Sequence, residues 1–274
     1  MKLYWQTVSL WLKLQNNTCR VNYERNDKYL MGNFKINSCG ISDIGISKEV
    51  NQDSFVYKIV EAGDSYAGLF AVADGVGGLK DGEISSAIAI SNLNKWWEQD
   101  FKNHYNDIDR LIPSLIKCFT KSNAEIMDYA RLKKLRTATT LSVLLIHKDN
   151  YYIVHIGDSR VYKITKKIER LSMDHSCFID KTINGKIYKK SVLTECLGNK
   201  AEINYYCASG EISKNDIFMV CSDGIYKTIE ENEILKMVKS QKSDLQQACQ
   251  STIDEAKNRG ENDNITLILA KISK

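Results

Sequence analysis

The sequence predicts an α+β fold in which antiparallel β-sheets are covered by helices. Five short apolar runs are rich in Val, Ile, Leu or Phe, as is typical of strands. They span residues 67–73, 141–147, 151–156, 217–221 and 265–272. The second and third runs are separated by Lys148-Asp149-Asn150, which predicts a tight hairpin. Because hairpins rather than helical crossovers join neighbouring strands, the sheets are expected to be antiparallel.

Three segments predict helices that pack on these strands. The clearest is near the C-terminus, where apolar residues recur at the three-and-four spacing of one buried face. They are Leu245, Ala248, Cys249, Thr252, Ile253 and Ala256. Ser243 followed by Gln246 predicts a capping box at its start. A second helix is expected from Glu83 past residue 97, and a third between 111 and 135, where Pro113 is compatible only with the first turn.

Length and composition indicate a globular protein with a substantial core. The chain has 274 residues, of which 43% are hydrophobic and 26% charged, and one proline. Its net charge of +4, from 38 basic and 34 acidic residues, argues against a nucleic-acid binder. No apolar run reaches the roughly 18 residues that span a bilayer. We expect a domain at residues 34–274, preceded by an N-terminal extension, 1–33, that packs on it.

The eight cysteines favour a reducing compartment. None forms a C-x-x-C pair, none has a histidine at zinc-ligand spacing, and several lie in apolar runs where free thiols act as small hydrophobic groups. The short apolar stretch at residues 3–12 lacks a small-residue cleavage site, so a signal peptide is not expected. We therefore expect a cytoplasmic protein.

Five aspartates lie at the starts or ends of predicted strands. In chain order they are Asp53, Asp74, Asp158, Asp223 and Asp263. In an antiparallel sheet the start of one strand meets the end of its neighbour, so these carboxylates are expected at one rim. Converging carboxylates repel unless a cation neutralises them, and oxygen-only ligands favour Mg²⁺ or Mn²⁺. The alternative is that each Asp-Gly pair only forms a strand-ending turn.

Six segments in a fixed order bear a family resemblance. They are Asn51-Gln52-Asp53-Ser54, Asp74-Gly75-Val76-Gly77-Gly78, Gly157-Asp158-Ser159-Arg160, Asp174-His175-Ser176, Cys221-Ser222-Asp223-Gly224 and Asp263-Asn264-Ile265-Thr266. Over about residues 37–273 the chain resembles the metal-dependent serine/threonine protein phosphatases of type 2C, the PPM family, in their compact bacterial form. The resemblance implies a four-layer α-β-β-α sandwich, two antiparallel sheets flanked by helices.

The resemblance also implies a centre with two Mn²⁺ or Mg²⁺ ions. It implies that Asp74 bridges both ions and that the carbonyl of Gly75 binds one of them. Asp223 and Asp263 are implied as ligands of the other ion. Asp74 and Asp223 are thus the implied catalytic residues, acting through the metals and a bound water.

Further residues are implied to support this centre. Asp53 and Gln52 are implied to hold metal-bound waters. Asp53 is therefore assigned to the metal site, and Gln52 and Asn264 are assigned to the residues that support it. The implied chemistry is direct hydrolysis of a phosphate monoester by an activated water.

The sequence departs from the family pattern at three places. The substrate phosphate is usually held by an arginine three residues before Asn51; here that residue is Lys48, which pairs as a point charge. The eukaryotic histidine after the Asp-Gly pair is replaced by Val76. No carboxylate stands at 134–136, where bacterial relatives place a ligand for a third metal, so a third ion is not expected.

The remaining motif residues carry less specific expectations. The segment 176–192 is short for the substrate-recognition flap of the family. Asp158 is expected to accept backbone hydrogen bonds and pair with Arg160, and His155 to be a core residue. For His175, a structural role and contact with substrate stay open.

These observations predict a phosphatase that removes phosphate from serine and threonine in proteins. Its expected partners are phosphorylated proteins and a cognate serine/threonine kinase in signalling, and it is expected to be a monomer. One alternative is a catalytically silent type 2C fold that binds or senses a partner. Such a fold has no need for Asp74, Asp223 and Asp263 together, and all three are present. A small-molecule phosphoester is a further alternative substrate.

Overall fold

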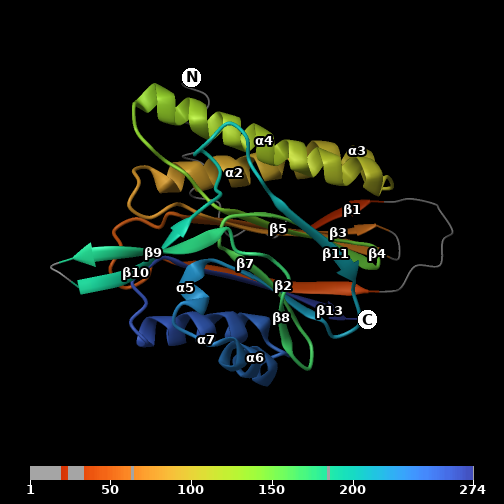
Figure 1. The fold of residues 1–274 in the computed structure, drawn as a ribbon. Coiled ribbons are helices and arrows are strands. Elements are labelled where there is room, and N and C mark those ends of the chain that lie inside the picture. The colour runs from red at the N-terminus through yellow and green to blue at the C-terminus, as the bar shows by residue number, and fades with distance from the viewer. Residues whose placement is uncertain (1–19, 24–33, 63–64, 184–185, 274) are drawn as a thin grey trace.

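The computed structural model describes residues 20–23, 34–62, 65–183 and 186–273. Its elements form four layers, helices above and below two stacked sheets (Figure 1). This architecture confirms the predicted α-β-β-α sandwich. Of the predicted extension at residues 1–33, only 20–23 lie within the described residues, and the rest of that prediction falls outside them.

The first sheet has six strands. In spatial order they are β1 (Arg20–Tyr23), β3 (Asp53–Ala62), β4 (Ser65–Asp74), β5 (Leu141–His147), β6 (Asn150–Ile156) and β11 (Tyr206–Glu211). All neighbours are antiparallel except β1, which lies parallel to β3 at the edge. The predicted hairpin between β5 and β6 is confirmed, with Lys148 at φ 55° in its two-residue turn.

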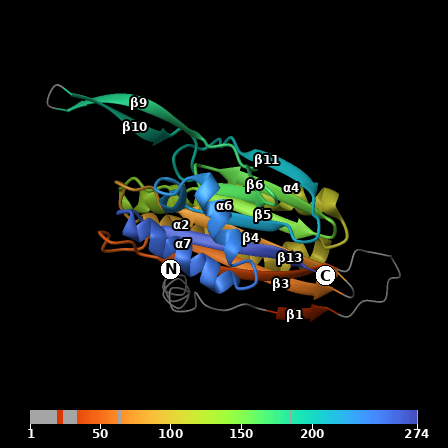
Figure 2. The same ribbon diagram turned by 90° about the horizontal axis from the view of Figure 1, so that it is seen from below.

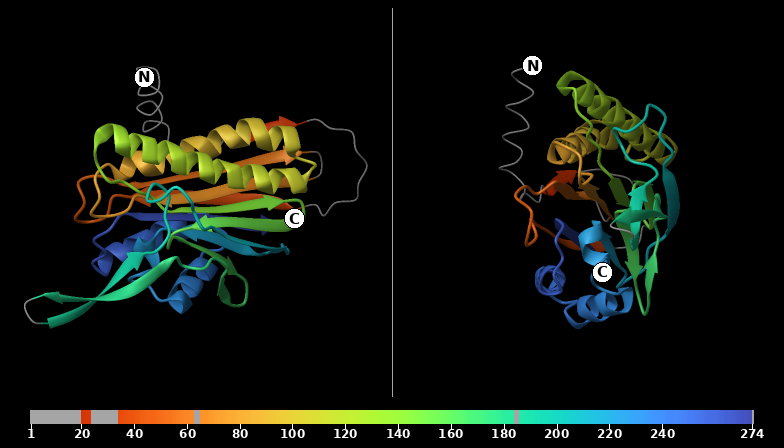
Figure 3. Two further views of the ribbon diagram at one scale, coloured as in Figure 1. Left: turned by 45° about the horizontal axis from the view of Figure 1, so that its top comes forward. Right: turned by 60° about the vertical axis from the view of Figure 1, so that its left-hand side comes forward.

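The second sheet has five antiparallel strands. In spatial order they are β2 (Lys35–Asp43), β13 (Ile265–Ser273), β12 (Ile217–Cys221), β7 (Arg160–Ile164) and β8 (Ile168–Arg170). Two further strands, β9 (Ser176–Ile183) and β10 (Lys186–Leu193), pair only with each other. This hairpin projects from one end of the sandwich (Figures 2 and 3). The segment expected to be a short flap is therefore an extended arm.

Helices cover the outer face of each sheet. On the first sheet lie α2 (Gly82–Trp96), the π-helical turn η1 (Trp97–Phe101), α3 (Lys102–His104) and α4 (Ile108–Lys133); on the second lie α5 (Asp223–Tyr226), α6 (Glu231–Ser240) and α7 (Leu245–Asn258) (Figure 1). No helix among the described residues combines the length and apolar character that crossing a bilayer requires.

Strand β4 shows why the central strands are apolar almost throughout. Successive side chains of a strand point to opposite faces. Leu69 and Ala71 pack toward the helices α2 and α4, whereas Phe70 and Val72 pack between the two sheets. Both faces are buried, so the sequence shows a continuous apolar run rather than alternation.

Two local predictions for helices are wrong. The N-cap of α7 is Asp244, which accepts the backbone N–H of Gln247, instead of a Ser243 capping box. Helix α4 begins at Ile108, so Pro113 lies in its second turn. Pro113 removes one helical hydrogen bond, but Pro113 and Asp109, whose carbonyl loses the donor, are both exposed, so water has access to that carbonyl.

The packing between the sheets predicts which phenylalanine matters for stability. Phe218 is fully buried between the sheets, whereas Phe178 on the projecting hairpin is 75% exposed. We expect Phe218→Ala to lower the free energy of unfolding by about 3–5 kcal/mol. Phe178→Ala is the matched control and should change it by less than about 0.5 kcal/mol. Urea denaturation measures both, and equal losses would contradict this packing.

Candidate metal centre

The ends of four strands bring four of the predicted aspartates to one end of the sandwich. Asp53 begins β3 and Asp74 ends β4, and the two residues are direct partners in the antiparallel register. Asp223 follows β12 by two residues, and Asp263 precedes β13 by two, in the neighbouring sheet. The β9–β10 hairpin projects from this same end (Figure 1). The expected convergence on one rim is therefore present.

Asp53 joins the two sheets through one of its oxygens. Its Oδ2 accepts hydrogen bonds from the hydroxyls of Ser222, at 2.8 Å, and Thr266, at 2.6 Å, both from the opposite sheet. The Asp53 side chain is only 2% exposed. Its second oxygen, Oδ1, is buried and has no hydrogen-bond partner in the described part of the chain. A buried carboxylate oxygen without a donor is suited to a cation.

Asp223 and Asp263 are contacted by lysines. Lys227 Nζ contacts Asp223 Oδ2 and lies 4.0 Å from Asp263 Oδ2. Lys48 Nζ lies 2.8 Å from Asp263 Oδ1. As the side chains stand, no three His, Cys, Asp or Glu residues of the described ranges meet closely enough to hold a metal ion. Asp223 Oδ1 is nevertheless buried and unpartnered, like Asp53 Oδ1.

The pKa values of these carboxyls reflect burial and mutual repulsion. Burial raises the pKa of Asp53 to about 7, against the opposing effect of its two hydroxyl donors. Burial, with the nearby Asp53 and Asp223 charges, raises the pKa of Asp74 well above its ordinary value. Burial also raises the pKa of Asp223, although Lys227 opposes it. Burial would raise the pKa of Asp263 too, but Lys48 and the backbone N–H of Asn264 together lower it.

Gly75 stands where no side chain fits. A Cβ at this position would lie 2.6 Å from the carbonyl of Gly82 and 2.8 Å from the carbonyl oxygen of Gln52. The backbone N–H of Gly75 donates to that Gln52 oxygen at 3.1 Å. The side chain of Gln52 donates to Glu83 at 3.4 Å. This close backbone approach explains the glycine after Asp74.

Asn264 positions the loop that bears Lys48. Its Nδ2 donates to the backbone oxygens of Ile44, at 2.9 Å, and Val50, at 3.2 Å. Its Oδ1 accepts the backbone N–H of Gln52 at 2.9 Å. Asn264 thus closes the loop 44–50 against the start of β3. The supporting role of Asn264 at a metal site stays a prediction.

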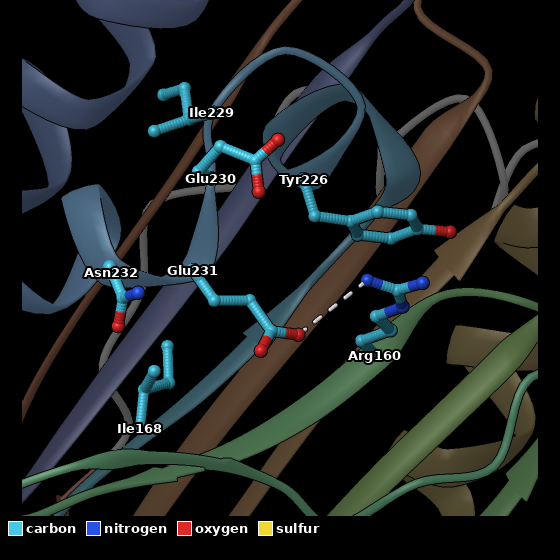
Figure 4. A pocket seen from close by; sticks show the side chains of 7 residues that line it. All are labelled: Arg160, Ile168, Tyr226, Ile229, Glu230, Glu231 and Asn232. Carbon is cyan, nitrogen blue, oxygen red and sulfur yellow. Dashed lines mark ion pairs between the residues drawn. The ribbon is translucent and has the colours of Figure 1, made fainter.

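The prediction for Asp158 is wrong in its partner. Arg160 pairs with Asp174 instead, through Nε to Oδ1 at 3.1 Å and Nη2 to Oδ2 at 2.7 Å. The guanidinium also stacks over the ring of Tyr226 at 3.5 Å, where it borders a small pocket with Glu231 (Figure 4). Asp174 lies in the loop between β8 and β9, and both of its carboxylate oxygens accept hydrogen bonds from the Arg160 guanidinium, a bidentate contact. Burial raises the pKa of Asp158 to about 6.

The two motif-region histidines have structural partners. His155 is fully buried, as predicted, with Nδ1 2.8 Å from the Ser142 hydroxyl and Nε2 3.0 Å from the Gly157 carbonyl. Burial lowers its pKa to about 4. His175 accepts the Gly157 N–H at 3.3 Å through Nδ1. That bond is a structural contact.

Sequence reasoning missed three residues of the site. Ser222 and Thr266 lie within the recognised segments, but nothing in the pattern shows that both hydroxyls reach Asp53 across the sandwich. The signal that could have found them is a hydroxyl residue close to each aspartate: Ser222 directly precedes Asp223, and Thr266 follows Asp263 by three residues. Lys227, one helical turn after Asp223, carried no signal at all.

Comparison with known proteins identifies the fold family. The family model described as protein phosphatase 2C matches residues 45–264. The chain belongs to the protein phosphatase 2C family. The matched range lies within the predicted domain at residues 34–274 and includes all the predicted site residues.

Relatives within this family are distant but cover most of the chain. The protein phosphatase PhpP of Streptococcus pneumoniae is 26% identical over 243 residues, 85% of this chain and 96% of that protein. The serine/threonine phosphatase stp of Listeria monocytogenes is 28% identical over 216 residues, 74% of this chain and 84% of that protein. Among solved structures, the catalytic domain of the phosphatase PstP in complex with two manganese ions has a TM-score of 0.69 at 22% identity, covering 88% of this chain and 100% of that one. At that identity the structural match supports the fold alone.

The raised pKa of Asp53 predicts a pH-dependent stability when divalent cations are removed. The folded protein binds this proton more tightly than the unfolded chain, so folding loses stability as pH rises from about 4 to about 7. Asp53→Asn cannot ionise and keeps an oxygen for the two hydroxyls. We expect the free energy of unfolding in EDTA to fall with pH in the wild type relative to this variant. Denaturant titrations across the window test it; parallel pH profiles would contradict the assigned burial.

Proposed function

We propose that this chain is a metal-dependent phosphatase that hydrolyses phosphoserine and phosphothreonine in proteins. The observation that supports it best is the pair of buried, unpartnered oxygens, Asp53 Oδ1 and Asp223 Oδ1, at the rim where Asp74 and Asp263 also lie. Family membership and the phosphatase names of its relatives support the reaction class.

The proposed metal set uses oxygen ligands only. Asp74 and the carbonyl of Gly75 would hold one Mn²⁺ or Mg²⁺ ion, and Asp223 and Asp263, together with Asp74, would hold the other. Asp53 contributes its unpartnered oxygen, and Gln52 lies behind it. Two such ions, when bound, activate water for attack and neutralise charge on a transferring phosphoryl group.

The chain's own residues orient the substrate and the ligands. Ser222 and Thr266 hold Asp53 in one orientation, so its free oxygen faces a fixed direction. Lys48 lies on the loop held by Asn264, and a Cβ on Gly77 would lie 3.9 Å from its ammonium. We assign Lys48 to the substrate phosphate, which it attracts as a point charge.

We also propose the substrates, the opposing enzyme and the location of this phosphatase. The substrates are phosphorylated proteins, and the counterpart is a serine/threonine kinase, so the enzyme acts in reversible signalling in a bacterial cell. The seven cysteines that the structure describes are all free thiols, which fits the proposed cytoplasmic location. A monomeric state and the absence of a third metal site are parts of the same proposal.

Phosphate release from a phosphothreonine peptide tests the reaction. We expect release with Mn²⁺, none with EDTA, and a loss of about 100-fold or more in Asp223→Asn, because the ligand charge at the site is removed. Asp216→Asn is the matched control, since Asp216 precedes the same strand β12 at its opposite end and is also buried. Asp216→Asn should keep its activity wherever it remains folded. A folded, manganese-binding wild type without activity would reject the proposed reaction.

Variants of Lys48 test its contact with the phosphate. We expect Lys48→Met to lower kcat/KM about tenfold, chiefly through KM, because the phosphate loses a cation. Lys48→Arg should raise kcat/KM above wild type, since a guanidinium binds a phosphate through two hydrogen bonds. The control is Lys257→Met: Lys257 is equally exposed, at 33%, and pairs with Asp43 at 2.9 Å. Identical kinetics for Lys48→Met and Lys257→Met would reject the assignment.

A further inference from the structure

Lys227 reaches into the half of the site formed by Asp223 and Asp263. Its ammonium contacts Asp223 Oδ2 and lies 4.0 Å from Asp263 Oδ2. The other oxygen of Asp263 pairs with Lys48 at 2.8 Å. Each carboxylate thus gives at least one oxygen to an ammonium group. By contrast, Asp74 forms no ion pair among the described residues, although it belongs to the same rim.

The backbone of Lys227 is held in place, while its side chain is partly exposed to solvent. The N–H of Lys227 donates to the carbonyl of Asp223 at 3.1 Å, closing the short helix α5. The preceding Tyr226 is fixed by the stacked Arg160 and by a hydrogen bond to the Asp158 carbonyl at 2.7 Å (Figure 4). The Lys227 side chain itself is 44% exposed. Its four-carbon stem can therefore swing to solvent while α5 stays where it is.

An ammonium group and a divalent cation exclude each other at these oxygens. A metal ion takes the same carboxylate oxygens as its ligands, and two positive charges at that separation repel. Asp223 Oδ1 is buried and has no hydrogen-bond partner among the described residues, so this oxygen is suited to a cation. The lysine must leave Asp223 Oδ2 before that carboxylate can serve a second ion with both oxygens.

We propose that Lys227 is an internal counter-cation that neutralises Asp223 and Asp263 in the metal-free protein and competes with the second divalent ion. This inference rests on the proposed dinuclear centre. It makes the two ions unequal, since Lys227 contacts Asp223 and lies 4.0 Å from Asp263, whereas no ion pair is formed with Asp74 among the described residues. The ion at Asp223 and Asp263 is consequently the weaker one, and its affinity is set by a residue that need not touch substrate.

Calorimetric titration of the full chain with Mn²⁺ tests this competition without any activity measurement. We expect two binding steps in the wild type. Lys227→Met keeps the stem but removes the charge, and should tighten the weaker step about tenfold, or about 1.4 kcal/mol, with the tighter step unchanged. Lys227→Arg keeps the charge and should bind as weakly as wild type.

A matched lysine controls for general charge effects. Lys200 is also 44% exposed and pairs with a half-buried carboxylate, Glu195, at 2.5 Å, rather than with one of the rim aspartates. Lys200→Met should leave both Mn²⁺ steps unchanged. Equal tightening by Lys200→Met and Lys227→Met would overturn the specific role of Lys227, as would unchanged affinity in Lys227→Met.

Thermal unfolding gives a second readout that separates the two proposals. In EDTA, Lys227→Met should melt at a lower temperature than wild type, because Asp223 and Asp263 lose their counter-charge. Saturating Mn²⁺ should then raise its melting temperature by more than it raises that of wild type. Two manganese steps with no difference between these proteins would reject only the competition. The absence of manganese binding in every protein would reject the dinuclear centre and the competition with it.

Discussion

The contact between the two sheets at the aspartate rim depends on one buried carboxylate, that of Asp53. Asp53 would be costly to bury alone, since an isolated charge in an apolar interior loses its hydration. Two hydroxyls from the other sheet, Ser222 and Thr266, supply donors to one of its oxygens. Ser42 in turn bonds Thr266 at 2.8 Å, and Asn51 bonds Ser42 at the same distance. The sheets therefore meet at the rim through a polar network, in which the Oδ1 of Asp53 is left without a hydrogen-bond donor among the described residues.

The site lies at the ends of buried strands and includes residues of the irregular loops that follow them. Strand ends supply the aspartates, and their strands are buried on both faces by helices and by the other sheet. Backbone contacts then bring the turns together: a Cβ on Gly224 would lie 2.3 Å from the carbonyl oxygen of Asn264. The backbone of the proposed ligand residues is held in place this way, whereas the side chains of Asp223 and Asp263 must first release Lys227 and Lys48.

Local pattern predicted antiparallel sheets covered by helices and the aspartate rim, whereas the four-layer arrangement was implied by the family resemblance. The apolar runs 141–147 and 217–221 coincide with β5 and β12, since fully buried strands leave an unbroken apolar signal. Strands β8 and β11 were not predicted, because they lie at sheet edges and contain exposed polar residues. The Asp174 partner of Arg160 could not be read from a turn motif either, as it depends on how a loop folds back.

The convergence of the aspartates was predictable from the sequence, but their contacts with lysines were not. Aspartates at strand ends are visible in a sequence, and their convergence follows from antiparallel pairing. The lysines that contact them come from a loop and a short helix, at separations that no periodicity encodes. Lys227 is one such residue: its reach toward Asp223 depends on the single turn of α5, which only the folded chain defines.

The pairing register of β13 has a consequence for which changes in chain length this fold tolerates. Thr266 faces Asp53 because it lies two residues after Asn264, which anchors the neighbouring loop. Adding or deleting one residue between them would turn every following side chain of β13 to the opposite face of its sheet. The buried carboxylate would lose a donor, and the core would receive the wrong set of side chains.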